Sequence, residues 1–350
     1  MTTLPQRRSR AVLQQIAHRV MIERGLEPDF SPAALAELSK INSAAGKSAG
    51  TRDLRHLLWC SIDNDDSRDL DQLSVGEALP DGNTKLTVAV ADVAALLHQG
   101  SALDAHAQEN TTSVYTAGQI FPMLPEKLST DLTSLNFDTD RLAVIVEMVF
   151  RPDGEMVKSD VSEGIVRNHA KLAYNSVAAW LDGKGPKPAP IGLVPGLAEN
   201  IQLQHHFAQQ LRARRHMRGA LSLQTLEARP VFLGDILEDL RADESNVAKN
   251  LIEELMVAAN GVTARFLEAH RSPSMRRVVR TPIHWDRIVE LAALRKYVLP
   301  TEPDGVALEK FLVTARDANP ADFPDLSLAV IKLLGAGEYV IELPGATAPG

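Results

Sequence analysis

The feature that most constrains this chain is a crowd of carboxylates between residues 61 and 72. Five aspartates fall within nine positions there, and the stretch follows the apolar run 57–60. At roughly 5 Å and an effective dielectric constant of about 20, each close pair of carboxylates costs about 3 kcal/mol. Water must screen these charges or a cation must offset them. Leu70 and Leu73 are spaced among the acids, which indicates a partly buried loop and favours the cation. The aspartates are Asp63, Asp65, Asp66, Asp69 and Asp71.

Hard oxygen ligands at this density suit Mg²⁺, with Mn²⁺ as a second candidate. Such ions perform phosphoryl chemistry in proteins. A solvated acidic turn that needs no ion remains open as a simpler interpretation. A calcium EF-hand loop beginning at Asp63 is excluded, because its sixth and twelfth positions require Gly and Glu and hold Arg68 and Ser74.

A phosphatase with an aspartate nucleophile is a further, minor alternative. Asp63 and Asp65 would supply its Asp-x-Asp pair after a buried strand. That scheme leaves Asp69 and Asp71 without a role. Replacing Asp69 with Asn therefore separates the two chemistries, since it would disable a nuclease and spare this phosphatase.

Composition limits the class of protein. The chain has 350 residues, 45% of them apolar and 23% charged, which is ordinary for a soluble globular protein with one large domain or two. No run approaches the length of a membrane helix, and the first residues lack the apolar core of a signal peptide. The single cysteine, Cys60, cannot form an internal disulfide, so we expect a reducing, cytoplasmic setting. We expect a monomer.

Charge is distributed unevenly along the chain. The net charge of −8 argues against a surface that grips nucleic acid everywhere, whereas three local basic clusters would allow a focused track for phosphates. Solvated faces or helix ends would explain the same clusters, and the sequence leaves both readings open. The clusters are Arg7, Arg8, Arg10 and Arg19; Arg212, Arg214, Arg215, His216 and Arg218; and Arg271, Arg276, Arg277 and Arg280.

Hydrophobic periodicity predicts an α+β fold. Alternation predicts strands over 85–93 and 142–150, a turn at 151–154, a returning strand over 156–161 and another strand over 164–172. The Pro- and Gly-rich segment 184–196 is typical of an exposed loop. The second half is predicted to be mainly helical. Its helices are expected near 174–181, 199–217, 245–269, 285–296, 305–318 and 325–335.

The first 50 residues form a separate helical segment in this interpretation. Residues 6–24 show a helical apolar face, and Ser31-Pro32 opens a second helix that runs to about residue 40. The small, polar segment 42–50 reads as a linker. The two helices would form a helix-turn-helix-like module or pack on the main body, which would then span 51–350.

A series of short motifs runs along the chain. They are Ser61-Ile62-Asp63, Arg68-Asp69-Leu70-Asp71, Ala91-Asp92-Val93, Thr112-Ser113-Val114-Tyr115, Phe121-Pro122-Met123-Leu124-Pro125, Leu132-Thr133-Ser134-Leu135-Asn136, Arg141-Leu142-Ala143, Arg218-Gly219-Ala220-Leu221 and Leu251-Ile252-Glu253-Glu254-Leu255-Met256 through Asn260. Each motif alone is weak, but their order over roughly 52–340 resembles that of the ribonuclease II/ribonuclease R (RNB-domain) family.

The resemblance implies an RNB-type catalytic domain, a mixed sheet flanked by helices, that hydrolyses single-stranded RNA processively from 3′ to 5′ into nucleoside 5′-monophosphates with Mg²⁺. Asp63, Asp69 and Asp71 would hold one or two ions beside the scissile phosphate. One ion would activate the attacking water and the other would stabilise the leaving 3′ oxygen. Tyr115 would stack on the base at the 3′ end, unless it is a core residue.

Further RNA contacts follow from the same resemblance. One of Glu253 and Glu254 would reach the terminal ribose, unless both pair with arginine instead. The remaining candidates are Asn260, Arg141, Arg218 and Arg277. The chain departs from the family at Gln72, where an aspartate is common. An amide oxygen ligates a cation without adding charge, so a second ion would be held less firmly.

The resemblance also implies segments that this sequence does not contain. After residue 350 the family supplies a Tyr-Thr-x-x-Ser-Pro-x-Arg stretch, whose arginine stabilises transition-state charge, and then an S1-type barrel; cold-shock barrels precede the catalytic domain. We therefore expect 51–350 to be incomplete at its C-terminus and weakly active, because such a charge clamp is often worth about 100-fold in rate. The alternative is a catalytically inactive RNA-binding remnant of the same fold.

Overall fold

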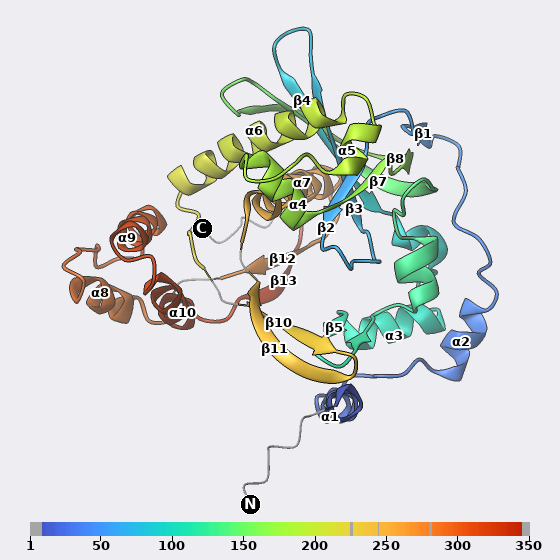
Figure 1. Cartoon of the computed structure of the whole chain (residues 1–350), viewed down its shortest axis with the longest axis horizontal. Coiled ribbons are helices and arrows are strands. Elements are labelled where there is room, and N and C mark those ends of the chain that lie inside the picture. The colour runs from blue at the N-terminus through green and yellow to red at the C-terminus, as the bar shows by residue number, and fades with distance from the viewer. Residues whose placement is uncertain (1–8, 225–226, 244, 280–281, 345–350) are drawn as a thin grey trace, which may run out of the picture.

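A seven-stranded mixed sheet forms the centre of the molecule (Figure 1). The computed structural model describes residues 9–224, 227–243, 245–279 and 282–344. The strand order is β1-β8-β7-β4-β3-β2-β9, with parallel pairing of β1 to β8 and of β2 to β9 and antiparallel pairing elsewhere. The strands are β1 (Arg52–Asp53), β2 (Cys60–Asp63), β3 (Gln72–Ala78), β4 (Thr84–Ala91), β7 (Asp140–Phe150), β8 (Met156–Arg167) and β9 (Ala170–Ala173).

Alternating side chains place an apolar core on each face of the sheet. In β4, Leu86 and Val88 join one core and Ala89 joins the other, because successive residues of a strand point to opposite faces. In β7, Val146 and Ile145 divide in the same way. The predicted α+β class is confirmed.

Four helices cover the first face. They are α4 (Tyr174–Leu181), α5 (Ala189–Leu193), α6 (Leu197–Met217) and α7 (Val247–Ala269), and Figure 1 shows α4, α6 and α7 gathered beside the sheet. The prediction of an exposed loop over 184–196 was wrong in part, because α5 lies within it and buries Ile191 to 1% exposure. Pro190 in the first turn of α5 fits a helix start, where the missing N–H costs nothing.

The strand predicted over 164–172 is two strands. β8 continues to Arg167, and β9 begins at Ala170 after the chain crosses to the far edge of the sheet. Asn168 lies at the crossing with its side chain buried; its amide donates to the Ser61 Oγ and to the Leu135 carbonyl. The predicted turn at 151–154 is present, with Gly154 at φ 79°, in the left-handed region that favours glycine.

Three β ribbons were not predicted. One lies before the second half of the chain, and two lie within the half that was predicted to be mainly helical. The three ribbons are β5 (Val114–Tyr115) with β6 (Ile120–Phe121), β10 (Glu227–Leu233) with β11 (Ile236–Asp243), and β12 (Ser274–Val278) with β13 (Glu338–Glu342). Pairing of β12 with β13 joins segments about 60 residues apart, which no local periodicity reveals.

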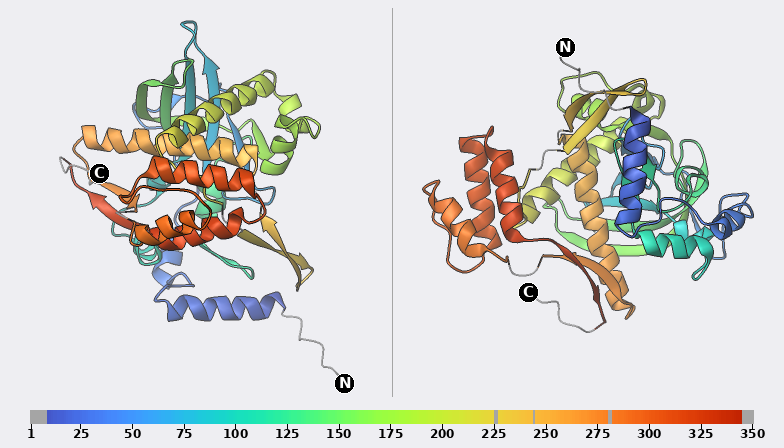
Figure 2. Two further views of the ribbon diagram at one scale, coloured as in Figure 1. Left: turned by 90° about the vertical axis from the view of Figure 1, so that its left-hand side faces the viewer. Right: turned by 90° about the horizontal axis from the view of Figure 1, so that it is seen from below.

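Three C-terminal helices form a unit with its own core, seen as a separate group in Figure 2. They are α8 (Trp285–Ala293), α9 (Gly305–Ala318) and α10 (Phe323–Leu334), close to their predicted ranges. The buried Glu309 of α9 joins this unit to the end of α6: its carboxylate accepts from the Ser222 hydroxyl and backbone N–H, both at 2.6 Å.

The N-terminal helices pack on the main body. Ala34 of α2 (Pro32–Leu38) is buried with Leu103 of α3 (Ala102–Asn110). Arg10 begins α1 (Arg10–Glu23), and its guanidinium lies 4.1 Å from the ring centre of Phe232 in β10. The Ser31 hydroxyl caps α2 as predicted. The division of the chain at residue 50 stays a prediction.

Two short turns, η1 (Val93–Leu96) and η2 (Lys127–Leu132), complete the described elements. No helix in the described part of the chain has the length and apolarity needed to cross a bilayer.

Candidate active site

The aspartate cluster lies at one end of the sheet, on the loop between β2 and β3 (Figure 1). Asp63 is the last residue of β2, and its Oδ1 accepts from the Asn64 N–H at 2.7 Å and from the Ser67 hydroxyl at 2.8 Å. Asp71 directly precedes β3, and its carbonyl accepts from the Ala91 N–H at 2.9 Å. The loop therefore begins and ends on strands, which hold its two ends at adjacent positions of the sheet.

A buried leucine holds the middle of this loop. Leu70, between Asp69 and Asp71, is 2% exposed and belongs to the second core. The Ser134 hydroxyl accepts from the Leu70 N–H and donates to the Arg68 carbonyl, both at 3.0 Å. The predicted partly buried loop is thus present, with its carboxylates around an apolar anchor.

Mutual repulsion is visible in the electrostatics of the loop. Burial raises the pKa of Asp71 to about 6, and the charges of Asp63 and then Asp69 add to the rise. Asp71 is itself exposed, so its desolvation comes from the surrounding protein and not from complete enclosure. A fully solvated acidic turn is disfavoured by Leu70, which anchors the middle of the loop in the core.

Tyr115 reaches the cluster from β5. Its hydroxyl donates to Asp69 Oδ2 at 2.9 Å. Desolvation, that hydrogen bond and the neighbouring aspartates raise the pKa of Tyr115 to about 12, so the group stays protonated. The side chain is 64% exposed, which argues against the alternative that Tyr115 is a core residue. Its stacking on a base stays a prediction.

Tyr174 is a neighbour that the sequence reasoning missed. It opens α4 directly after Ala173, which pairs with Asp63 in the sheet. Burial raises the pKa of Tyr174 to about 12, with further contributions from Asp63 and Asp71. The only signal in the sequence was an aromatic residue at the end of a predicted strand.

The donor set suits a hard divalent cation in its chemistry. All three aspartates offer carboxylate oxygens, and their repulsion would be relieved by a positive ion. Their present arrangement is open: among the described residues, no three His, Cys, Asp or Glu side chains converge closely enough to share an ion. Ser67 and Tyr115 instead occupy one oxygen of Asp63 and one of Asp69. Gln72 is the first residue of β3 and is 9% exposed.

The two glutamates proposed for the terminal ribose both contact an arginine. Arg215 Nη2 lies 2.6 Å from Glu254 Oε1 and 3.1 Å from Glu253 Oε1. Glu254 is 2% exposed. This is the arginine pairing that the sequence left open as the alternative. No hydrogen bond or ion pair between described residues joins either glutamate to the aspartates, and a ribose contact stays a prediction.

The other predicted RNA contacts lie on four different elements. Arg141 donates to the carbonyls of Asp131 and Asp140 and so holds η2 against β7. Arg218 is exposed at the end of α6, and Asn260 is exposed on α7. Arg277 lies on β12 with its guanidinium 5.7 Å from the Tyr339 ring centre. Of the basic clusters, Arg7, Arg8 and Arg280 fall outside the described residues.

Comparison with known proteins defines the class. The RNB domain family matches residues 51–348, and the chain belongs to this family. Ribonuclease R of Vibrio parahaemolyticus is 34% identical over 234 residues, which are 67% of this chain and 28% of that protein. The chain therefore spans little more than a quarter of the length of this curated relative.

Solved structures share the fold at low identity. Mycoplasma genitalium RNase R in complex with double-stranded RNA matches with a TM-score of 0.83 and 22% identity, over 94% of this chain and 59% of that one. The yeast pseudonuclease Ssd1 matches with a TM-score of 0.65 and 16% identity, over 85% of this chain and 36% of the Ssd1 chain. Since a pseudonuclease has this fold, activity must be argued from the site.

Proposed function

We propose that the protein is a Mg²⁺-dependent 3′→5′ exoribonuclease that hydrolyses single-stranded RNA to nucleoside 5′-monophosphates. The observation that carries the proposal is the loop that holds Asp63, Asp69 and Asp71 at one end of the sheet, with the Tyr115 hydroxyl bonded to Asp69. A cluster that repels itself costs stability, and a site that binds a cation and a phosphate gives it a use. Membership of the RNB domain family supports the reaction class.

The residues divide the work in this proposal. Asp63, Asp69 and Asp71 would hold the metal, with the Gln72 amide as a neutral fourth ligand. When bound, the ion would lower the pKa of water and neutralise charge on the phosphate. Tyr115 would release Asp69 and place its exposed ring against the terminal base. Tyr174, whose pKa Asp63 and Asp71 help to raise, would border the same site.

An RNA-binding protein without catalysis is the second candidate. The open arrangement of the aspartates and the shared fold of the yeast pseudonuclease favour it. The phosphatase alternative has less support, because the Ser67 hydroxyl occupies Oδ1 of Asp63, the residue that would act as nucleophile or acid. A cytoplasmic location and a monomeric state stay predictions.

The test uses a 5′-labelled RNA oligomer with Mg²⁺. We expect a ladder that shortens from the 3′ end, abolished by EDTA and by Asp71→Asn. Asp65→Asn is the matched control, because Asp65 is an exposed aspartate of the same loop. No cleavage by the wild-type chain, with RNA binding retained in a gel shift, would establish the non-catalytic candidate. Phosphate release from a small phosphomonoester that is lost in Asp65→Asn and retained in Asp69→Asn would favour the phosphatase.

A further inference from the structure

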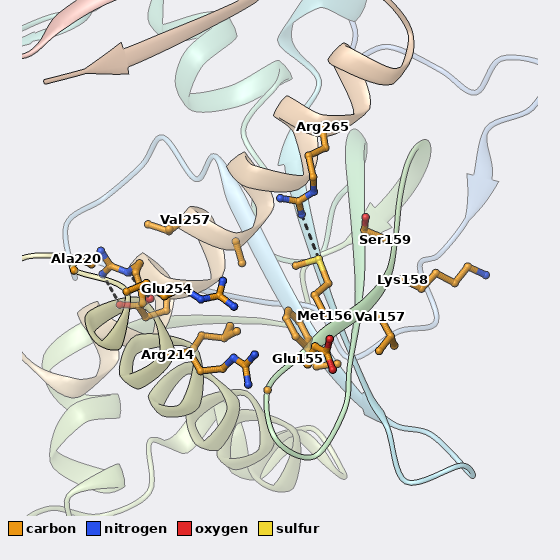
Figure 3. A pocket seen from close by; sticks show the side chains of 17 residues that line it. Glu155, Met156, Val157, Lys158, Ser159, Arg214, Ala220, Glu254, Val257 and Arg265 are labelled. Atoms are coloured by element: carbon orange, nitrogen blue, oxygen red, sulfur yellow. Dashed lines mark hydrogen bonds and ion pairs between the residues drawn. The ribbon is translucent and has the colours of Figure 1, made fainter. Parts of the chain in front are cut away.

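A cleft of about 760 Å³ opens between the end of α6, the middle of α7 and the start of β8. It is distinct from the aspartate loop. Figure 3 shows Arg214 and Arg265 approaching it from α6 and α7, with Met156 between them.

The cleft and the aspartates lie at opposite ends of the sheet. Ala91 bonds to Asp71 and pairs with Ala143 of β7, whereas the cleft is lined by Phe150 at the other end of that strand. Ala143 and Phe150 are seven residues apart. At about 3.3 Å per residue, this separates the two sites by about 23 Å along the sheet.

The charge of the cleft is positive although the protein is acidic overall. Its two lining carboxylates are both engaged: Arg151 contacts Glu155 at 2.5 Å and Arg215 contacts Glu254 at 2.6 Å. Three other arginines line the same space: Arg214, Arg218 and Arg265. With the carboxylates neutralised, these arginines leave a local excess of positive charge.

The guanidinium groups of Arg214, Arg218 and Arg265 make only weak interactions with the described residues. Arg265 donates to the Met156 thioether at 3.4 Å, and sulfur is a weak acceptor that carries no charge. Arg214 donates to the Asp153 carbonyl at 3.0 Å, with the Asp153 carboxylate 4.0 Å away. Arg218 makes no side-chain hydrogen bond or ion pair with the described residues. Planar guanidinium groups in this state suit a phosphate, which they bind through paired N–H donors.

The wall between the arginines is apolar. Phe150, Met156, Val257 and Ala258 contribute to it. A flat base or a ribose would cover this wall while its phosphate met the guanidinium groups. Inorganic phosphate would contact the guanidinium groups and leave the apolar wall uncovered.

We propose that this cleft is a second nucleotide-binding site. Arg214 and Arg265 bind the phosphate of the ligand, and the apolar wall packs against its base. The ligand is a nucleoside monophosphate, either free or as part of an RNA strand. Binding here requires neither the metal nor the aspartate loop.

Equilibrium binding in EDTA tests the site, because removal of divalent ions excludes binding through a metal at the aspartate loop. The probes are AMP, inorganic phosphate and a short oligouridylate, measured by calorimetry against the full chain. We expect AMP to bind more tightly than phosphate. Loss of one charge-assisted hydrogen bond in Arg265→Met should weaken AMP binding about tenfold. Arg265→Met should fold normally, since among the described residues that side chain bonds only to a thioether.

Two variants serve as controls in the same buffer. Arg287→Met removes an exposed arginine of α8 that does not line the cleft, and should leave AMP binding within about twofold, since only screened charge changes. Asp71→Asn should bind AMP as the wild type does. Binding of oligouridylate that Arg265→Met weakens, without binding of AMP, would assign the site to an RNA strand. Absence of binding by any probe, equal loss in Arg287→Met, or loss confined to Asp71→Asn would overturn the proposal.

Discussion

The Tyr115 hydroxyl and the Asp69 carboxylate meet at 2.9 Å although 46 residues of chain separate them. The contact brings a ribbon outside the main sheet, β5 with β6, against the loop at the sheet end. Through this contact Oδ2 of Asp69, a proposed metal ligand, accepts a hydrogen bond from the phenol of Tyr115. A cation at Asp69 and the hydrogen bond from Tyr115 therefore compete for the same atom.

Two substitutions of Tyr115 separate its ring from its hydroxyl. Tyr115→Phe keeps the exposed ring and frees Asp69, so RNA affinity in EDTA should stay within about twofold while less Mg²⁺ is needed for cleavage. Tyr115→Ala should weaken RNA binding about tenfold or more, because stacking of one base contributes about 1–3 kcal/mol. Fluorescence anisotropy with a labelled oligomer checks both. Equal affinity of the two variants would show that the ring does not contact RNA.

Ser134→Ala should loosen the aspartate loop. The substitution removes the acceptor for the Leu70 N–H and the donor to the Arg68 carbonyl in a buried place. We expect a loss of about 1–3 kcal/mol in the free energy of unfolding, measured by urea denaturation, with a lower kcat for RNA. Ser129→Ala is the control, because its single hydrogen bond is long, at 3.4 Å. Unchanged stability of Ser134→Ala would contradict the loop's proposed anchor.

Arg215→Met should destabilise the fold by about 3 kcal/mol, since it strands the buried carboxylate of Glu254. The double variant Arg215→Met/Glu254→Leu removes both charges and should recover most of the loss. Urea denaturation of the wild type, both single variants and the double variant measures the coupling. If the double variant is less stable than Arg215→Met, the charge pair is not what stabilises this contact.

The ion pair of Arg52 with Glu147 predicts a dependence of stability on pH. The hydrogen bond from Arg52 lowers the pKa of Glu147, so the unfolded chain binds its proton more readily than the folded one. The contribution is complete above the ordinary glutamate range and disappears as pH falls through the lowered folded pKa. Arg52→Met should cost about 1 kcal/mol at pH 7 and progressively less below pH of about 4. A difference that is constant with pH would refute this linkage.

Much of the fold was predictable because local patterns carried it. The alternation of Leu86 and Val88 with Thr87 and Ala89 identified β4, and helical periodicity identified α4 with the bounds that the structure shows. The density of aspartates identified the loop, and the leucines spaced among them indicated its partial burial. These features depend on neighbours within a few residues, which the sequence displays directly.

The rest depended on contacts between distant segments. The pairing of Arg215 with Glu253 and Glu254, the approach of Tyr174 to Asp63, and the ribbon of β12 with β13 all need the folded chain. The short helix α5 was hidden because its Pro and Gly residues are also typical of loops. The periodicity of one segment carries no information about its contacts with distant segments.

The ribbon of β12 with β13 also says how the three C-terminal helices are attached. Val278 pairs with Glu338, so the chain leaves for α8, α9 and α10 and returns at the same point. The three helices are therefore an insert whose two ends lie together at this ribbon. Glu309 of α9 fastens the insert to Ser222 at a second place, so a change in the insert would be felt at these two points before it reached the central sheet.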